Sequence, residues 1–145
     1  MSKKINKDIY LKALDYLALR DHGTNELIKK LKKKFDSTSE IKEVIDHLVF
    51  KKFLDENKAI KMYCENLFKK SYGRSYIISK LIQKGFTLSD INIVLETLNF
   101  DYFETCYSYC VKKGLDYNPK HLAKLQRRGF SFNTAKECLN SLQSS

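Results

Sequence analysis

Pairs of basic residues recur three times along the chain at the spacing of one helical turn. The two cations of a pair are four residues apart, which places them on one face of an α-helix. The pairs are Lys30/Lys34, Lys80/Lys84 and Lys124/Arg128. The whole chain carries a formal charge of +10. Clustered cations of this kind favour binding to phosphate or carboxylate groups, because a bound polyanion releases its counterions.

Two interpretations of these pairs remain open. Cations near the carboxyl end of a helix complement its macrodipole, which is worth about 0.3–1 kcal/mol for each exposed residue. The cations around the pairs exceed what this effect requires, which favours contact with phosphates or carboxylates of a partner. These surplus cations are Lys29, Lys32, Lys33, Lys69, Lys70, Arg74 and Arg127.

Tyrosines beside basic residues are a second candidate feature, because aromatic rings interleaved with cations can stack on the bases of single-stranded nucleic acids. Tyr72, Tyr76 and Tyr117 lie near expected helix starts, whereas most of the other aromatic residues fit a core. Combined with the basic pairs, this pattern gives a set of candidate binding residues for an extended anionic partner. The set is Lys30, Lys34, Tyr72, Arg74, Lys80, Lys84, Lys124, Arg127 and Arg128.

The sequence contains no motif typical of an enzyme or a metal centre. His22, His47 and His121 are far apart, and no Ser-His-Asp set, Walker-type loop or His-Glu-x-x-His string is present. The cysteines form no Cys-x-x-Cys pair, and their spacing completes no tetrahedral zinc set. They are Cys64, Cys106, Cys110 and Cys138. We therefore expect no catalysis, no cofactor and no metal, and we expect the cysteines to be buried thiols.

The segments that carry the basic pairs are internally repeated. Leu27 matches Ile77 at an offset of 50 residues, and Ile77 matches His121 at an offset of 44. The same offsets align apolar residues at helical spacing further along the chain. Glycines recur where helix breaks are expected. They are Gly23 and Gly73 after a first helix, and Gly85 and Gly129 after a second.

This pattern predicts three units of three helices each, spanning 9–54, 55–103 and 104–142. Thr24 or Ser75 is the expected cap of the second helix, and Pro119 suits the first turn of its third copy. The expected caps of the third helices are Ser39, then Thr87 or Ser89, then Ser131.

Composition supports an all-helical fold. The chain has 145 residues with one proline and five glycines, far fewer than sandwiches, barrels or Gly-rich nucleotide-binding folds use. A single unit of about 45 residues buries too little surface to be stable alone, so the units should stack into an elongated, curved tandem array. Residues 1–8 lack the apolar region of a signal peptide, and no apolar run approaches the ~20 residues that span a bilayer. We expect a cytoplasmic protein without membrane contact.

At the level of these segments the chain resembles the RecX family, the regulators of the RecA recombinase. Phe53–Ala59, followed by Tyr72-Gly73 and Leu81–Phe86, is similar to the central module of that family, and Lys124–Ser131 is similar to its carboxy-terminal signature. The likeness extends over nearly the whole chain. One departure is Lys34-Phe35, which lacks the glycine present at Gly85 and Gly129.

The resemblance implies a non-enzymatic array of three-helix repeats that lies in the groove of the RecA filament on DNA. A monomer is the simplest expectation for the oligomeric state. It implies modulation, usually inhibition, of ATP hydrolysis and strand exchange in DNA repair and recombination. The candidate binding residues would then contact the filament, with weaker binding to single- and double-stranded DNA. An alternative consistent with the basic residues alone is an autonomous helical nucleic-acid-binding module without a recombinase partner.

Overall fold

The computed structural model describes residues 4–143, so residues 1–3 of the amino-terminal segment discussed above lie outside it. Within the described residues the chain forms nine α-helices and no strand, which confirms the all-helical prediction. The helices are α1 (Lys7–Leu19), α2 (Thr24–Lys32), α3 (Thr38–Phe50), α4 (Glu56–Lys69), α5 (Arg74–Gln83), α6 (Leu88–Leu98), α7 (Tyr102–Lys113), α8 (Pro119–Arg127) and α9 (Phe132–Gln143).

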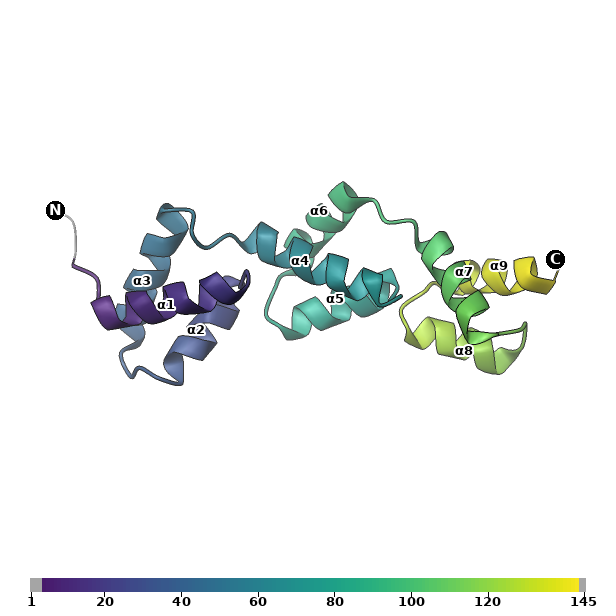
Figure 1. Cartoon of the computed structure of the whole chain (residues 1–145), viewed down its shortest axis with the longest axis horizontal. Helices are drawn as coiled ribbons and strands as arrows, with labels where there is room; N and C mark the ends of the chain where they lie inside the picture. Colours follow the sequence, from purple (N-terminus) through teal and green to yellow (C-terminus); the bar gives the residue numbers. More distant parts are fainter. Residues whose placement is uncertain (1–3, 144–145) are drawn as a thin grey trace.

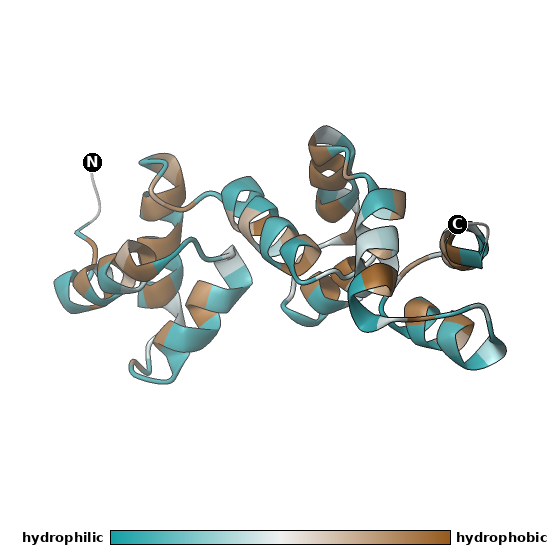
Figure 2. Ribbon diagram, turned by 45° about the vertical axis from the view of Figure 1, so that its right-hand side comes forward, coloured by the Kyte–Doolittle hydropathy of each residue, from teal (hydrophilic) through white to brown (hydrophobic). Residues whose placement is uncertain are grey.

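The helices form three successive units, α1–α3, α4–α6 and α7–α9, each around its own apolar core. Hydrophobic residues lie on the helix faces that turn toward one another within a unit (Figure 2). Residues that match in the repeat occupy matching core positions: Leu31, Leu81 and Leu125 are fully buried. The predicted unit borders fall at the N-cap of α4 and within the first turn of α7.

The units follow one another in an elongated array, with α1–α3 at one end and α7–α9 at the other (Figure 1). The second helices of the three units, α2, α5 and α8, lie along the same side of this array, the lower side in Figure 1. The first residues of the predicted pairs, Lys30, Lys80 and Lys124, lie within these helices, whereas the second residues, Lys34, Lys84 and Arg128, follow the last helical residue. The fold therefore places the three pairs on and just after the second helices, along one edge of the molecule.

The caps of the second helices differ from the prediction. Gly23 and Gly73 are the N-caps of α2 and α5, whereas Thr24 and Ser75 already lie inside the first helical turn. A side chain at either glycine would collide with the next unit, which excludes the usual polar N-cap residue. In the third copy, Pro119 begins α8 as predicted, and Asn118 is its N-cap.

The third helices use short polar caps, as predicted. Ser37 rather than Ser39 caps α3, because its hydroxyl accepts a hydrogen bond from the Glu40 amide. Thr87 caps α6 and Ser131 accepts from the Thr134 amide at the start of α9. No described helix is long and apolar enough to cross a bilayer.

Candidate functional site

Two joints connect the three units, and both use the same elements. At each joint the start of a second helix contacts the end of the second helix in the following unit. The first joint consists of residues 23–25 against 85–86, and the second of residues 73–75 against 128–130. The joints set the relative positions of the basic residues on successive units.

The second joint is closed by main-chain hydrogen bonds. The Gly73 amide donates to the Arg128 carbonyl at 2.7 Å, and the Ser75 amide donates to the Gly129 carbonyl at 3.2 Å. A Cβ at Gly73 would lie within 3.0 Å of the Gly129 and Phe130 main chain, and Gly129 has a φ of +100°. Only glycine allows this backbone approach and this left-handed conformation together.

The first joint has the same arrangement, but the donor across it is the side chain of Asn25 instead of a main-chain amide. The Asn25 side-chain amide donates to the Gly85 carbonyl at 3.0 Å, and a Cβ at Gly23 would overlap the Phe86 ring. This explains why Phe35 stands where the second and third units have glycine. Within residues 4–143 no unit comes before α1–α3, so the close approach that requires glycine at the other two positions is not made at the end of α2.

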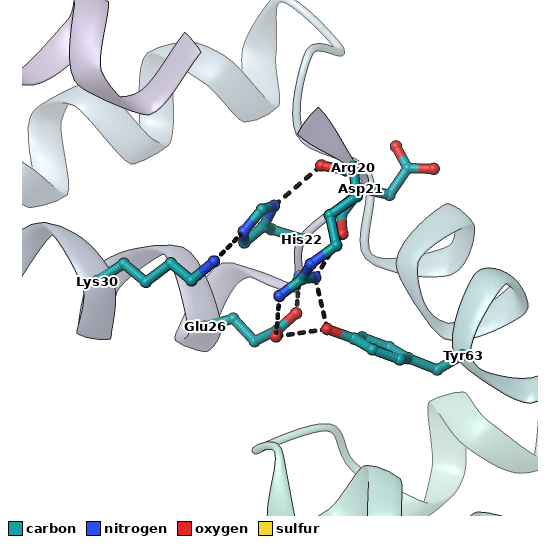
Figure 3. A network of polar contacts seen from close by, with 7 residues as sticks. Arg20, Asp21, His22, Glu26, Lys30 and Tyr63 are labelled. Atoms are coloured by element: carbon teal, nitrogen blue, oxygen red, sulfur yellow. Dashed lines mark hydrogen bonds and ion pairs between the residues drawn. The ribbon is translucent and has the colours of Figure 1, made fainter. Parts of the chain in front are cut away.

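A polar network surrounds the first joint (Figure 3). The Glu26 carboxylate accepts hydrogen bonds from the Tyr63 hydroxyl at 2.6 Å, the Arg20 guanidinium at 3.2 Å and the Gly23 amide at 3.0 Å. Arg20 also donates to the Tyr63 hydroxyl, and the Thr24 amide donates to the Glu56 carboxylate. Burial raises the pKa of Glu26, but these hydrogen bonds outweigh it and hold the pKa below its usual value.

His22 extends this network toward the basic edge. Its ring is buried, with Nδ1 2.9 Å from the Arg20 carbonyl and Nε2 2.8 Å from the Lys30 ammonium. These partners fit a neutral ring that donates through Nδ1 and accepts through Nε2. Burial, together with the charges of Arg20 and Lys30, lowers the pKa of His22, although the carbonyl contact opposes the shift. Burial also lowers the pKa of Lys30.

The predicted binding residues are distributed along the edge formed by α2, α5 and α8 rather than gathered at one point. Lys34, Arg74, Lys84 and Arg127 are exposed, and Lys30, Lys80, Lys124, Tyr72 and Arg128 are half-buried. Several of the cations lie over tyrosine rings within their own unit. Lys84 lies 4.5 Å from the Tyr63 ring centre, and Lys80 lies 5.4 Å from that of Tyr76.

Tyr72 and Arg128 have contacts inside the second joint. The Tyr72 ring stacks on Tyr76 with centres 3.9 Å apart, and the Arg128 guanidinium lies 4.2 Å from the Tyr72 ring centre. Because Tyr76 covers one face of the ring, Arg128 must cover the other, which leaves no face of Tyr72 open to a base. Arg128 also donates to the Ser71 and Lys70 carbonyls at the end of α4.

Two clefts lined with cations open beside the joints. The first basic cleft, of about 470 Å³, contains Lys29, Lys30, Lys33 and Lys84. The second basic cleft, of about 270 Å³, contains Lys69, Lys70, Lys112, Lys113 and Arg128. The set predicted from sequence did not include Lys112 and Lys113. The sequence feature that could have indicated them is the pair of adjacent lysines at the end of α7, which resembles Lys69-Lys70 at the end of α4.

The cysteines are buried thiols, as predicted. Burial raises the pKa of Cys64 to about 11, which makes it unreactive at neutral pH. Cys106, Cys110 and Cys138 lie close together in the third core. Within residues 4–143 no group of His, Cys, Asp and Glu side chains is arranged to hold a metal ion.

Comparison with known proteins agrees with this architecture. Residues 10–48 match the family model described as RecX, first three-helix domain. A crystal structure of RecX from Lactobacillus salivarius superimposes with a TM-score of 0.81, covering 95% of this chain and 96% of that one at 20% identity. A regulatory protein RecX from Pseudomonas fluorescens SBW25 is 26% identical over 135 residues, covering 88% of this chain and 87% of the relative.

The chain is similar to proteins of the RecX family over most of its length. Regulatory proteins RecX from Pseudomonas fluorescens Pf-5 and Ectopseudomonas mendocina are 30% and 32% identical over 92 residues. These two matches cover 63% of this chain but only 59% and 61% of the relatives. The similarity to the RecX crystal structure therefore accounts for the fold of three three-helix units, and it does not by itself explain the basic edge or the two clefts.

Proposed function

We propose that this RecX-like chain is a non-enzymatic modulator, in the inhibitory sense, of a RecA-type recombinase. As a monomer it would bind along the groove of the recombinase–DNA filament and reduce ATP hydrolysis and strand exchange. The relatives it matches carry the name regulatory protein RecX, which supports a regulatory role.

The observation that carries this proposal is the position of the three basic pairs along one edge of an elongated array. A filament repeats its surface at regular intervals, so an extended partner that repeats its own cations can contact successive subunits and the DNA between them. Arg128 is an exception within the proposed set, because its contacts hold the second joint together. Its role in filament binding would therefore be indirect.

Charge reversal tests the basic edge. The variant K80E/K84E/K124E reverses the charge of both residues in the second pair and of Lys124 in the third pair. It leaves Arg128 in place. We expect it to remain helical and to lose binding to the assembled filament. The matched control, K7E/K42E/K136E, makes the same charge change at exposed lysines of α1, α3 and α9. If both variants bind the filament as the unmodified chain does, the basic edge has no part in binding.

An autonomous nucleic-acid-binding module remains the second candidate, because the second basic cleft is lined by five cations and, among residues 4–143, by no carboxylate, as a phosphate site would be. Salt separates the two functions. Binding driven only by phosphate contacts weakens with a log–log slope of about −0.7 for each single-strand phosphate neutralised. We expect binding to the filament to persist at a salt concentration where binding to bare DNA has vanished. Loss of both at the same salt concentration would favour the autonomous module.

A further inference from the structure

The two joints share a plan but differ in charge. The first joint holds two carboxylates, Glu26 and Glu56, which accept hydrogen bonds from its cation and main-chain amides. Glu26 aligns with Tyr76 at the repeat offset of 50, and Glu56 aligns with Tyr102 when the N-caps Asp55 and Asp101 are matched. The second joint therefore lacks the negative charges that neutralise the first.

Cations nevertheless gather at the second joint. Lys70 stands where the first joint has Arg20, and Tyr109 stands where it has Tyr63. The second basic cleft takes Lys69 and Lys70 from the middle unit and Lys112, Lys113 and Arg128 from the last unit. Its lining includes no carboxylate.

Helix macrodipoles account for only part of this charge. The cleft lies at the carboxyl ends of α4, α7 and α8, each of which carries roughly −0.5 of an elementary charge. Three such ends offset about one and a half of the five positive charges in the cleft. A net charge of more than about +3 remains in a space of about 270 Å³ that both units line.

We infer that the second basic cleft binds phosphate groups of a nucleic-acid backbone and thereby fixes the second joint. The bound phosphates would supply the negative charge that Glu26 and Glu56 supply at the first joint. The inference deepens the proposed function, on which it rests, by naming DNA backbone as the chemistry recognised at this place.

The cleft is built for backbone rather than for bases. Tyr109 is buried, and the Arg128 guanidinium lies 4.3 Å from its ring centre, so this ring offers no open face for stacking. Two guanidinium nitrogens of Arg128 already donate to main-chain carbonyls. The four lysines are flexible point charges that contact phosphate oxygens without reading sequence. Binding at this cleft should therefore be independent of base sequence.

Phosphate binding should also slow opening of the joint. The lysines belong to two units, so an anion that contacts both sides draws the units together. The Gly73 and Ser75 amides donate across the same joint, to Arg128 and Gly129. Their hydrogen exchange with solvent requires the joint to open, which makes them reporters of its closure.

The test compares K112Q/K113Q with the matched control K7Q/K42Q, which removes the same charge from exposed positions on unit 1. Binding of an oligothymidylate is measured by fluorescence anisotropy at salt concentrations from about 50 to about 300 mM. We expect the log–log salt slope of K112Q/K113Q to be smaller in magnitude by about 1.4, and its affinity at 0.1 M salt to be roughly 25-fold lower. Equal behaviour of the two variants would overturn the site.

Hydrogen exchange supplies the second readout. Adding the oligonucleotide should slow exchange at Gly73 and Ser75 in the unmodified chain and in K7Q/K42Q, but not in K112Q/K113Q. Inorganic triphosphate, the probe for a free phosphate ligand, should protect these amides only weakly. Protection by triphosphate alone, or oligonucleotide binding without protection, would overturn the inference. A failure of the proposed function would look different. The chain would still bind the oligonucleotide at this cleft, but it would leave the activity of the recombinase unchanged.

Discussion

The Gly73 amide donates a hydrogen bond of 2.7 Å to the Arg128 carbonyl, which joins two units through their main chains. The nitrogen belongs to the N-cap of α5 and the carbonyl to the C-cap of α8. The starts of α2 and α5 therefore lie where the second helix of the next unit ends. This head-to-tail order holds the basic pairs of α5 and α8 in fixed relative positions along one edge of the molecule.

We predict that Gly73→Ala opens the second joint. Its Cβ would lie within 3.0 Å of main-chain atoms, which cannot move aside as a side chain can. Overpacking of this kind costs about 1–3 kcal/mol, and the amide hydrogen bonds to Arg128 and Gly129 would be lost as well. Urea unfolding should show lower stability, and small-angle scattering should show a more variable shape. The control Ser75→Ala, at an exposed side chain, should behave like the unmodified chain.

Arg128→Lys should weaken the same joint without changing the net charge. The guanidinium donates to the Lys70 and Ser71 carbonyls and covers two tyrosine rings, which a lysine ammonium cannot do together. We expect a loss of about 1–3 kcal/mol in the free energy of unfolding. Arg127→Lys, at the exposed neighbouring position, is the matched control. Equal stability of the two variants would remove Arg128 from the joint.

Tyr63→Phe is predicted to loosen the first joint. The change deletes one hydroxyl, which donates to Glu26 and accepts from Arg20 across two units. Each such hydrogen bond contributes about 1 kcal/mol, and the Arg20–Glu26 pair would remain. Hydrogen exchange should accelerate at the Thr24 amide, which faces Glu56 in this joint. Unchanged exchange there would show that Tyr63 contributes only through its ring.

The stability of the chain should fall on mild acidification because of His22. Its folded pKa lies below the usual 6.5, so the unfolded state takes up a proton at a higher pH than the folded state. The stabilising contribution is therefore complete above about pH 6.5 and is lost as the pH falls from there toward the folded pKa. The slope is at most about 1.36 kcal/mol for each pH unit in this window.

Urea unfolding of the unmodified chain and of His22→Gln between about pH 7.5 and 5 measures this contribution. The stability difference between them should shrink as the pH falls. Glu26 does not interfere in this range, since its lowered pKa withdraws stability only below its usual value of 4.5. A difference that stays constant over the range would mean that His22 is not held neutral by the fold.

Much of the architecture could be predicted from the sequence because its signals are local and repeated. Matching apolar residues such as Leu31, Leu81 and Leu125 indicated equivalent helices, and recurring glycines indicated helix breaks. The reason for the glycines could not be predicted. Gly23 and Gly73 serve a contact with another unit, which a helix-capping argument within one unit does not contain.

The candidate site was predictable only in part for the same reason. Helical spacing placed the basic pairs on one edge, but it could not show that Arg128 lies across Tyr72 from a neighbouring unit. Helical spacing also could not show that Lys112-Lys113 lies beside Lys69-Lys70, since the two pairs of lysines come together only at the second joint. Contacts between units far apart in sequence decide which cations are free to bind a partner.

The measurement that tests the central claim most directly is DNA-dependent ATP hydrolysis by the cognate recombinase. The chain is titrated from substoichiometric to excess amounts over preformed filaments, with strand exchange followed in parallel. We predict that both activities fall as the chain is added, and that K80E/K84E/K124E lowers them far less than K7E/K42E/K136E does. Hydrolysis and strand exchange that stay unchanged throughout the titration would contradict the proposed function.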